Sequence, residues 1–259
     1  MGALTVAALL CVAPPARAGQ PPIVRPLDES RLPTLKLGEQ LYAGNCLSCH
    51  GVAGRANVST QPDTGASMIQ ELGPPLRGVG AQAADFYLST GYMPLNSARD
   101  QPIRHASPFS SRERQALVSY VASLGGGPPV PRPQPEHGDV ASGRKLFTEH
   151  CAGCHQVVAE GGIMTGAKAP PLKSATPVQI AEAVRIGPYV MPKFSTRDIS
   201  DDELNSIIAY VEYTKDPQDA GGWGISHLGP FPEGMVTWFL AAAVLVGTCL
   251  AIGKRGVRR

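Results

Sequence analysis

The sequence has little charge, few aromatic side chains and no spare cysteine. Charged residues make up 17% of the 259 positions, and 23 Lys and Arg nearly balance 21 Asp and Glu, so no excess of positive charge favours binding to nucleic acid. Aromatic residues make up 6%, whereas 29 glycines and 25 prolines are present. This composition predicts short helices joined by irregular loops, with room for a bound group in place of part of an apolar core.

The six cysteines leave none for a disulfide framework. Cys11 lies in an apolar N-terminal stretch and Cys249 in an apolar run near the C-terminus. The remaining four form two C-x-x-C pairs. A small secreted fold held together by disulfide bonds is therefore excluded.

Apolar runs at the two ends of the chain predict export and membrane anchoring. Residues 1–18 resemble a signal peptide that ends in an A-x-A cleavage pattern, although no Lys or Arg precedes the apolar stretch, so an uncleaved anchor is the alternative. Residues 235–253 carry no charge and come close to the ~20 residues that cross a bilayer as a helix. Residues 254–259 form a basic tail. The positive-inside rule then predicts a single-pass protein of the cell membrane, with a cytoplasmic C-terminus and the rest of the chain on the outer face.

Two similar segments flank a Pro- and Gly-rich linker at residues 125–138, which predicts tandem domains at residues 32–124 and 139–216. The first contains GEQLYAGNCLSCH and the second GRKLFTEHCAGCH, with Gly, Leu, an aromatic residue and C-x-x-C-H at the same spacing. Pro-Pro-Leu, Met-Pro and Tyr-Val follow in the same order in both. The first repeat is longer, with one extra loop before Pro74 and another between Met93 and Ser110.

Each repeat closes with a predicted helix that begins with a capping box. Ser110 and Glu113 form the first box, and Ser200 and Glu203 form the second. Apolar residues follow at i, i+3, i+4 and i+7, the spacing of a helix face that packs in a core. The predicted fold class is therefore all-α.

C-x-x-C-H is the attachment motif of haem c. Two thiols one helical turn apart meet the two vinyl groups, and the His of the same turn reaches the iron. A single C-x-x-C also suits a redox dithiol or half of a zinc site, but two copies with His in an exported chain favour two covalently bound haem c groups. The predicted attachment residues and proximal ligands are Cys46, Cys49 and His50 in the first copy and Cys151, Cys154 and His155 in the second.

Met93 and Met191 are predicted to hold the other axial position of each haem iron. Each precedes a proline and lies between Pro-Pro-Leu and the closing helix of its repeat. Met68 and Met164 are rivals, but Met68 has no counterpart in the other repeat and Met164 lies only nine residues after the proximal histidine. His105 would replace Met93 if the first haem were bis-histidine. A thioether ligand raises the potential of haem iron.

The Pro-Pro-Leu segments are predicted to pack on the haems. We expect Pro75 and Pro171 to lie beside the proximal histidines, and Leu76 and Leu172 to lie on the porphyrins. No residue is predicted to be catalytic. The nearly balanced charge of each domain predicts weak long-range steering, which favours partners that are held in place.

The whole layout resembles the dihaem cytochrome c subunit, cytochrome cc, of actinobacterial cytochrome bc complexes. The stretch GGWGISHLGP at residues 221–230, followed by PEG at 232–234, is similar to the juxtamembrane signature of that subunit. The resemblance implies two class I cytochrome c domains and one C-terminal transmembrane helix. It also implies a subunit of a respiratory quinol–cytochrome c reductase, a translocase with cytochrome b and Rieske iron–sulfur subunits. In that role the chain itself performs only electron transfer, from the Rieske protein through two haems to a terminal cytochrome c oxidase.

Three other interpretations share parts of this pattern. A free-standing, membrane-anchored dihaem carrier has every motif except the juxtamembrane stretch, and would purify without cytochrome b. A cytochrome c domain of an oxidase is disfavoured because no copper-site cluster of Cys, His and Met is present. A dihaem enzyme such as a peroxidase needs an open or Cys-ligated iron, which the two candidate methionines argue against.

Overall fold

The computed structural model describes the backbone of residues 22–55, 73–95, 101–217 and 230–257. The chain separates into two compact units, Met1–Lys215 and Asp216–Arg259. The predicted signal peptide and most of the juxtamembrane stretch lie outside the described residues.

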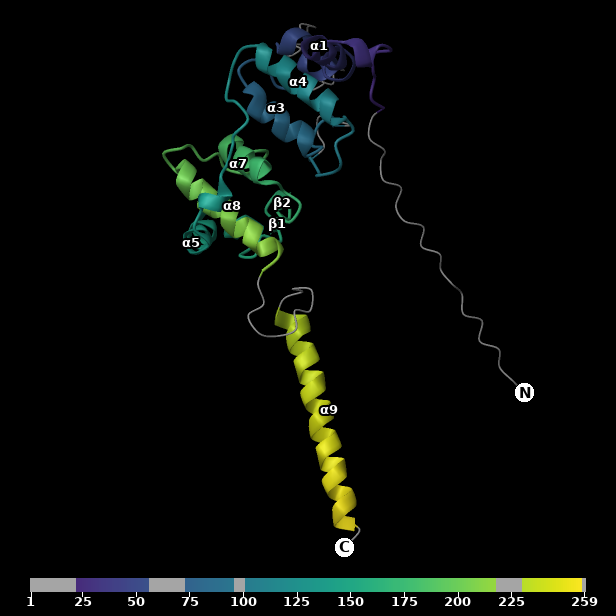
Figure 1. The fold of residues 1–259 in the computed structure, drawn as a ribbon, viewed down its shortest axis with the longest axis vertical. Helices are drawn as coiled ribbons and strands as arrows, with labels where there is room; N and C mark the ends of the chain where they lie inside the picture. Colours follow the sequence, from purple (N-terminus) through teal and green to yellow (C-terminus); the bar gives the residue numbers. More distant parts are fainter. Residues whose placement is uncertain (1–21, 56–72, 96–100, 218–229, 258–259) are drawn as a thin grey trace, which may run out of the picture. The chain divides into compact units, whose positions relative to one another are not determined.

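The first repeat folds around a contact between its first and last α-helices, which Figure 1 labels α1 and α4. The two helices approach closely at Gly38, where a Cβ atom would overlap the carbonyl group of Ala116. The rings of Tyr42 and Tyr120 pack beside this crossing, with centroids 5.1 Å apart and ring planes tilted by 48°. The elements of this half are η1 (Glu29–Arg31), α1 (Thr34–Asn45), α2 (Leu47–His50), η2 (Val52–Gly54), α3 (Gly80–Ser89) and α4 (Ser111–Ser123).

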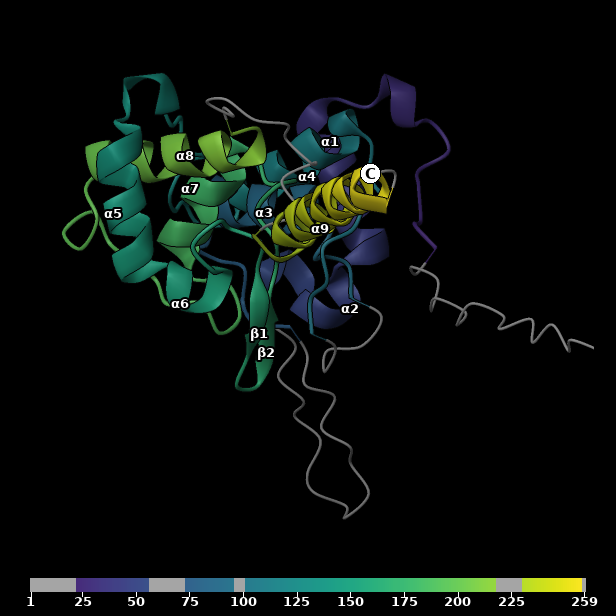
Figure 2. The ribbon, with the colours of Figure 1, turned by 90° about the horizontal axis from the view of Figure 1, so that it is seen from below.

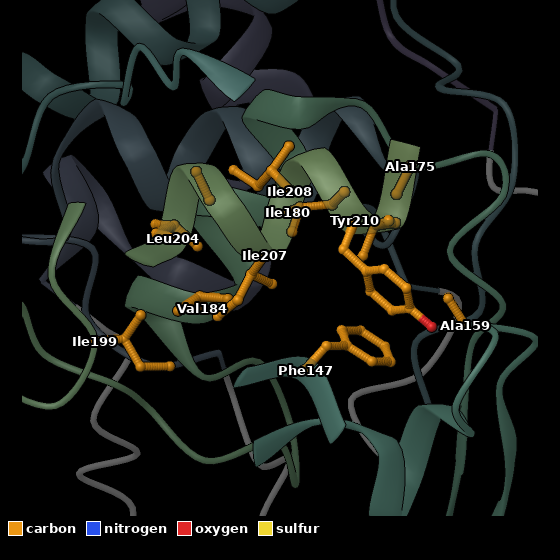
Figure 3. Close-up of a cluster of buried hydrophobic side chains, with 12 residues drawn as sticks. Phe147, Ala159, Ala175, Ile180, Val184, Ile199, Leu204, Ile207, Ile208 and Tyr210 are labelled. Carbon is orange, nitrogen blue, oxygen red and sulfur yellow. The ribbon is translucent and has the colours of Figure 1, made fainter. Parts of the chain in front are cut away.

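The second repeat has the same crossing, between α5 and α8. Gly143 packs against the carbonyl group of Ser206, where a Cβ atom would overlap it. Figure 3 shows the adjacent core, in which the rings of Phe147 and Tyr210 lie side by side with centroids 5.4 Å apart. The elements of this half are η3 (Pro135–His137), α5 (Val140–His150), α6 (Ala152–His155), β1 (Gly162–Met164), β2 (Ala167–Ala169), α7 (Pro177–Ile186) and α8 (Asp201–Lys215).

The predicted capping boxes are confirmed. The Ser110 hydroxyl accepts from the Glu113 amide at 3.2 Å, and the Ser110 amide donates to the Glu113 carboxylate at 2.6 Å. Ser200 and Glu203 make the same pair of bonds, at 3.3 and 2.8 Å. The apolar stripes also face the cores as predicted, most completely in α8, where Leu204, Ile207, Ile208 and Val211 are buried.

A small antiparallel hairpin, β1–β2, adds to the mostly helical fold and was not predicted (Figure 2). Its strands have three residues each, and Gly166 takes a φ of 81° in the turn. Strands this short do not show the alternation by which a strand is recognised in a sequence.

The linker contains one turn of 3-10 helix, η3, where the sequence predicts only extended chain. Its backbone is bonded to both repeats. The Gln82 amide donates to the Pro128 carbonyl at 3.1 Å, and the Gln134 amide donates to the Asn205 side chain at 2.8 Å. These bonds hold the linker against the domains on either side of it.

The C-terminal unit contains one long helix, α9 (Pro230–Val257). Its segment Gly234–Lys254 is long and apolar enough to cross a membrane, and no part of its most apolar window is buried. The described part of the chain therefore has one candidate membrane helix, near the C-terminus, which includes the predicted residues 235–253.

Candidate functional site

Both C-x-x-C-H motifs form the same structure, a short helix that starts directly after the first cysteine. In the first copy the His50 amide donates to the Cys46 carbonyl at 2.9 Å. The equivalent bond, from His155 to Cys151, is also 2.9 Å long. Each turn therefore places its two thiols and its imidazole one helical turn apart, the arrangement that haem c attachment needs.

A proline carbonyl orients each of these histidines. Nδ1 of His50 lies 2.8 Å from the Pro74 carbonyl oxygen, and Nδ1 of His155 lies 3.1 Å from that of Pro170. A carbonyl can only accept, so Nδ1 carries a proton in this bond, and in the neutral imidazole the lone pair is then on Nε2. A hydrogen bond of this kind holds a metal-ligating imidazole in the correct tautomer and orientation.

Pro75 and Pro171, the second proline of each pair, were predicted to lie beside the histidines, whereas the hydrogen bonds to the histidines go to the first proline, Pro74 or Pro170. The Pro-Pro doublet in both repeats marked this segment. Every residue has a backbone carbonyl, however, so the sequence does not show which carbonyl binds the histidine. Pro75 is exposed, whereas Pro171 lines a cavity beside His155. Leu76 and Leu172 each pack on the core cluster of their own repeat.

The first cysteine of each motif is a partly buried thiol. Burial raises the pKa of Cys46 to about 12 and that of Cys151 to about 11. A reactive dithiol would require a lowered thiol pKa instead. Within the described residues, no three or more His, Cys, Asp or Glu side chains gather at a spacing that holds a metal ion. Burial also lowers the pKa of His155, which favours the neutral imidazole that binds iron. The two thiols and the imidazole of each C-x-x-C-H turn fit haem c.

The second motif opens onto a cavity of about 1290 Å³, with its mouth included. Cys151, Cys154 and His155 line it, together with both methionines considered for this haem, Met191 and Met164. Met191 lies in a turn after α7, where its amide donates to the Pro188 carbonyl at 3.0 Å. Met164 ends strand β1. The hairpin thus carries the rival methionine to the same cavity, a placement that the sequence spacing did not predict.

In the first repeat, Met93 packs on the same core cluster as Cys46 and Leu76. The Met93 amide donates to the Tyr87 carbonyl at 3.0 Å. The rival Met68 lies outside the described residues. Nδ1 of the rival His105 lies 2.9 Å from the Ala106 carbonyl oxygen.

Comparison with known proteins matches each half to a cytochrome c family. Residues 35–125 match the family described as Cytochrome c, and residues 138–211 match the family described as Cytochrome C oxidase, cbb3-type, subunit III. The chain also has a weak structural likeness to a chain of the reducing HAO-like protein complex of Kuenenia stuttgartiensis. The TM-score is 0.37 and the identity 17%, over 68% of this chain and 94% of that one.

Similarity to whole proteins is much stronger. The cytochrome bc1 complex cytochrome c subunit of Mycobacterium tuberculosis is 37% identical over 243 residues, which cover 90% of this chain and 82% of that protein. The subunit of the same name from Corynebacterium diphtheriae is 35% identical, over 88% of this chain and 83% of that protein. Two haem-attachment turns, two cytochrome c domains and similarity over nearly the whole length agree: the chain belongs to the family of cytochrome c subunits of the cytochrome bc1 complex.

Proposed function

We propose that this chain carries electrons out of a respiratory quinol-oxidising cytochrome bc complex through two covalently bound haem c groups in series. One observation supports this most strongly. Both C-x-x-C-H turns have a histidine hydrogen-bonded to a proline carbonyl, at 2.8 and 3.1 Å, in a chain of the family named above. When bound, each haem c supplies one-electron exchange at its iron. The chain itself attaches, orients and shields the two groups.

In the proposed sites, Cys46 and Cys49 hold the first haem and His50 is its proximal ligand. Cys151, Cys154 and His155 have the same roles in the second site. Met93 and Met191 supply the thioethers on the opposite faces, because they occupy equivalent places in the two repeats and each packs on the core cluster of its own domain. The walls of the proposed haem sites are completed by Pro75 and Leu76 in the first domain and by Pro171 and Leu172 in the second.

The proposed partners are cytochrome b and the Rieske iron–sulfur protein within the complex, and a terminal cytochrome c oxidase beyond it. We assign electron entry to the first haem and exit to the second. Both haem domains belong to the compact unit Met1–Lys215, so electron transfer between them needs no bimolecular encounter. A free-standing carrier would lack the first two partners.

Purification tests the assignment to a complex. The membranes are extracted in a mild detergent and this chain is purified through an affinity tag. Cytochrome b and a Rieske protein should co-purify with it, with two haem c per copy of this chain. A haem-stained chain that purifies alone, at the same detergent concentration that keeps a known bc complex intact, would identify a free-standing carrier.

We further propose that the haem domains lie on the outer face of the cell membrane and that residues 254–259 are cytoplasmic. The charge-free residues 235–253 and the cations directly after them support this orientation. Alkaline phosphatase fused after Asp219 should be active, and the same enzyme fused after Arg259 should be inactive. The reverse pattern would overturn the orientation.

A further inference from the structure

The first haem domain contributes to the wall of the second haem's cavity. Besides the residues of its own domain, that cavity is lined by Phe86 and Tyr87 of α3, by Tyr92 just after α3, and by Gln101 and Arg104 of the loop that follows. The second site is therefore incomplete without the first domain.

Hydrogen bonds hold this loop against the second domain. Nη2 of Arg104 donates to the Ser174 carbonyl and to Oε1 of Gln179, both at 2.7 Å. Nε2 of Gln179 in turn donates to the Ser89 hydroxyl at 3.0 Å, which ties α7 to α3. Gln101 adds a longer bond of 3.5 Å to the Lys168 carbonyl of β2. The position of Arg104 at the cavity is thus fixed from both domains.

The loop belongs to one of the two extra segments that make the first repeat longer than the second. From Met93 to the capping serine Ser110 the chain runs 17 positions, whereas from Met191 to Ser200 it runs nine. The insertion has no counterpart in the second repeat, and it supplies Gln101 and Arg104. It therefore extends the first domain over the cavity of its neighbour.

Arg104 is a partly buried cation without a carboxylate partner among the described residues. Burial lowers its pKa, an effect that nearby Tyr92 opposes. Two other arginines do have such partners: Arg25 pairs with Glu113 and Arg185 with Asp201, each at 2.6 Å. Removing a cation from water is costly unless an anion compensates it. Both hydrogen bonds that Arg104 makes to the described residues go through Nη2, so among these residues Nε and Nη1 remain as donors toward such an anion.

We propose that Arg104, on the first domain, binds a propionate carboxylate of the haem attached to Cys151 and Cys154, and so positions that haem and raises its potential. The proposal rests on the proposed function, which places haem c in this cavity. Haem c carries two propionates at its edge, and a guanidinium is the side chain best suited to a carboxylate. A nearby positive charge stabilises the reduced haem, which has one positive charge fewer than the oxidised haem.

The test is a redox titration of the full-length holo chain in mild detergent, followed optically. Met191→His identifies the step of the second haem, because it should lower that step alone. Arg104→Gln should shift the reduction equilibrium of the second haem about tenfold toward the oxidised form, or ~59 mV for one electron, and leave the first haem unchanged. Loss of the cation should also raise the pKa of the propionate. The potential of the second haem should then vary with pH between 6 and 8, an effect that a purely structural residue would not cause.

Lys168→Gln is the matched control, because Lys168 also lines the cavity but is exposed to solvent. In Lys168→Gln, the potential of each haem should change by only a small fraction of the shift expected in Arg104→Gln. Equal shifts of both haems in Arg104→Gln, no shift, or the same shift in Lys168→Gln would each overturn the proposal. If Arg104→Gln does not accumulate, Arg104→Lys provides the test. Lysine keeps the positive charge. A potential of the second haem that does not vary with pH therefore supports the proposal, and a lowered potential that varies with pH refutes it. Haem staining that shows two haems in every variant would leave the proposed function intact in either case.

Discussion

Glu182 offers a sharp test of how the two haem domains pack. Its side chain is 0% exposed on α7, and neither carboxylate oxygen has a hydrogen-bond donor within the described residues. Burial, together with the negative charge of Asp85 on α3, raises its pKa from 4.5 to about 9. Helices α3 and α7 belong to different domains and contact one another. The folded chain therefore holds Glu182 protonated at neutral pH.

The sign of the pH effect follows from proton binding. Between pH 4.5 and 9 the folded state keeps a proton that the unfolded state releases, so stability should fall as pH rises, by about 1.4 kcal/mol per pH unit. Glu182→Gln replaces the neutral acid by a neutral amide of the same shape and removes this loss. At pH 7 the variant should be more stable by about 3 kcal/mol, which raises the melting temperature by on the order of 5–10 °C.

The assay is thermal unfolding of the full-length holo chain in mild detergent at several pH values from 6 to 8, followed by circular dichroism. The wild-type melting temperature should fall across this range, and that of Glu182→Gln should stay nearly level. Glu149→Gln, an exposed glutamate of the same domain, should behave as wild type. Asp85→Asn should weaken the pH dependence, because it removes the charge that faces Glu182. A destabilised Glu182→Gln with an unchanged pH slope would refute the reasoning.

Three further outcomes are expected. Cys46→Ala combined with Cys49→Ala should remove one of two haems per chain on haem-stained denaturing gels and by haem assay, and retention of two would contradict the attachment site. Met191→His should lower the potential of one haem in a redox titration, whereas two unchanged potentials would point to another ligand. Gly143→Ala should cost about 1–3 kcal/mol of stability, because its Cβ would overlap the Ser206 carbonyl, and an unchanged melting temperature would show that the crossing can relax.

The covalent chemistry and the helical framework were predictable because they leave periodic or duplicated patterns. The C-x-x-C-H pair and the capping boxes at Ser110 and Ser200 are local features, fixed by residues a few positions apart. Each of these features occurs once in each repeat, and the second occurrence strengthened the prediction of the first. The apolar run in α9 is equally local, since its composition alone predicts a helix that can cross a membrane.

Features that depend on distant contacts were not predictable. The Pro74 and Pro170 carbonyls that orient the histidines are backbone atoms, which the sequence does not distinguish. The β1–β2 hairpin is too short to show alternation, and it places Met164 at the cavity. The role of Arg104 depends on bonds across 70 and 75 positions of the chain, which spacing within a repeat cannot show.

The claim that electrons pass through the two haems in series is tested most directly by a variant that disables only the second haem site in an assembled complex. We expect that His155→Ala, in the purified complex, leaves quinol-driven reduction of the first haem at the wild-type rate. Oxygen consumption by a coupled oxidase should stop, because the exit site no longer functions. Normal quinol-driven oxygen consumption by this variant, without any added soluble cytochrome c, would contradict electron transfer through the two haems in series.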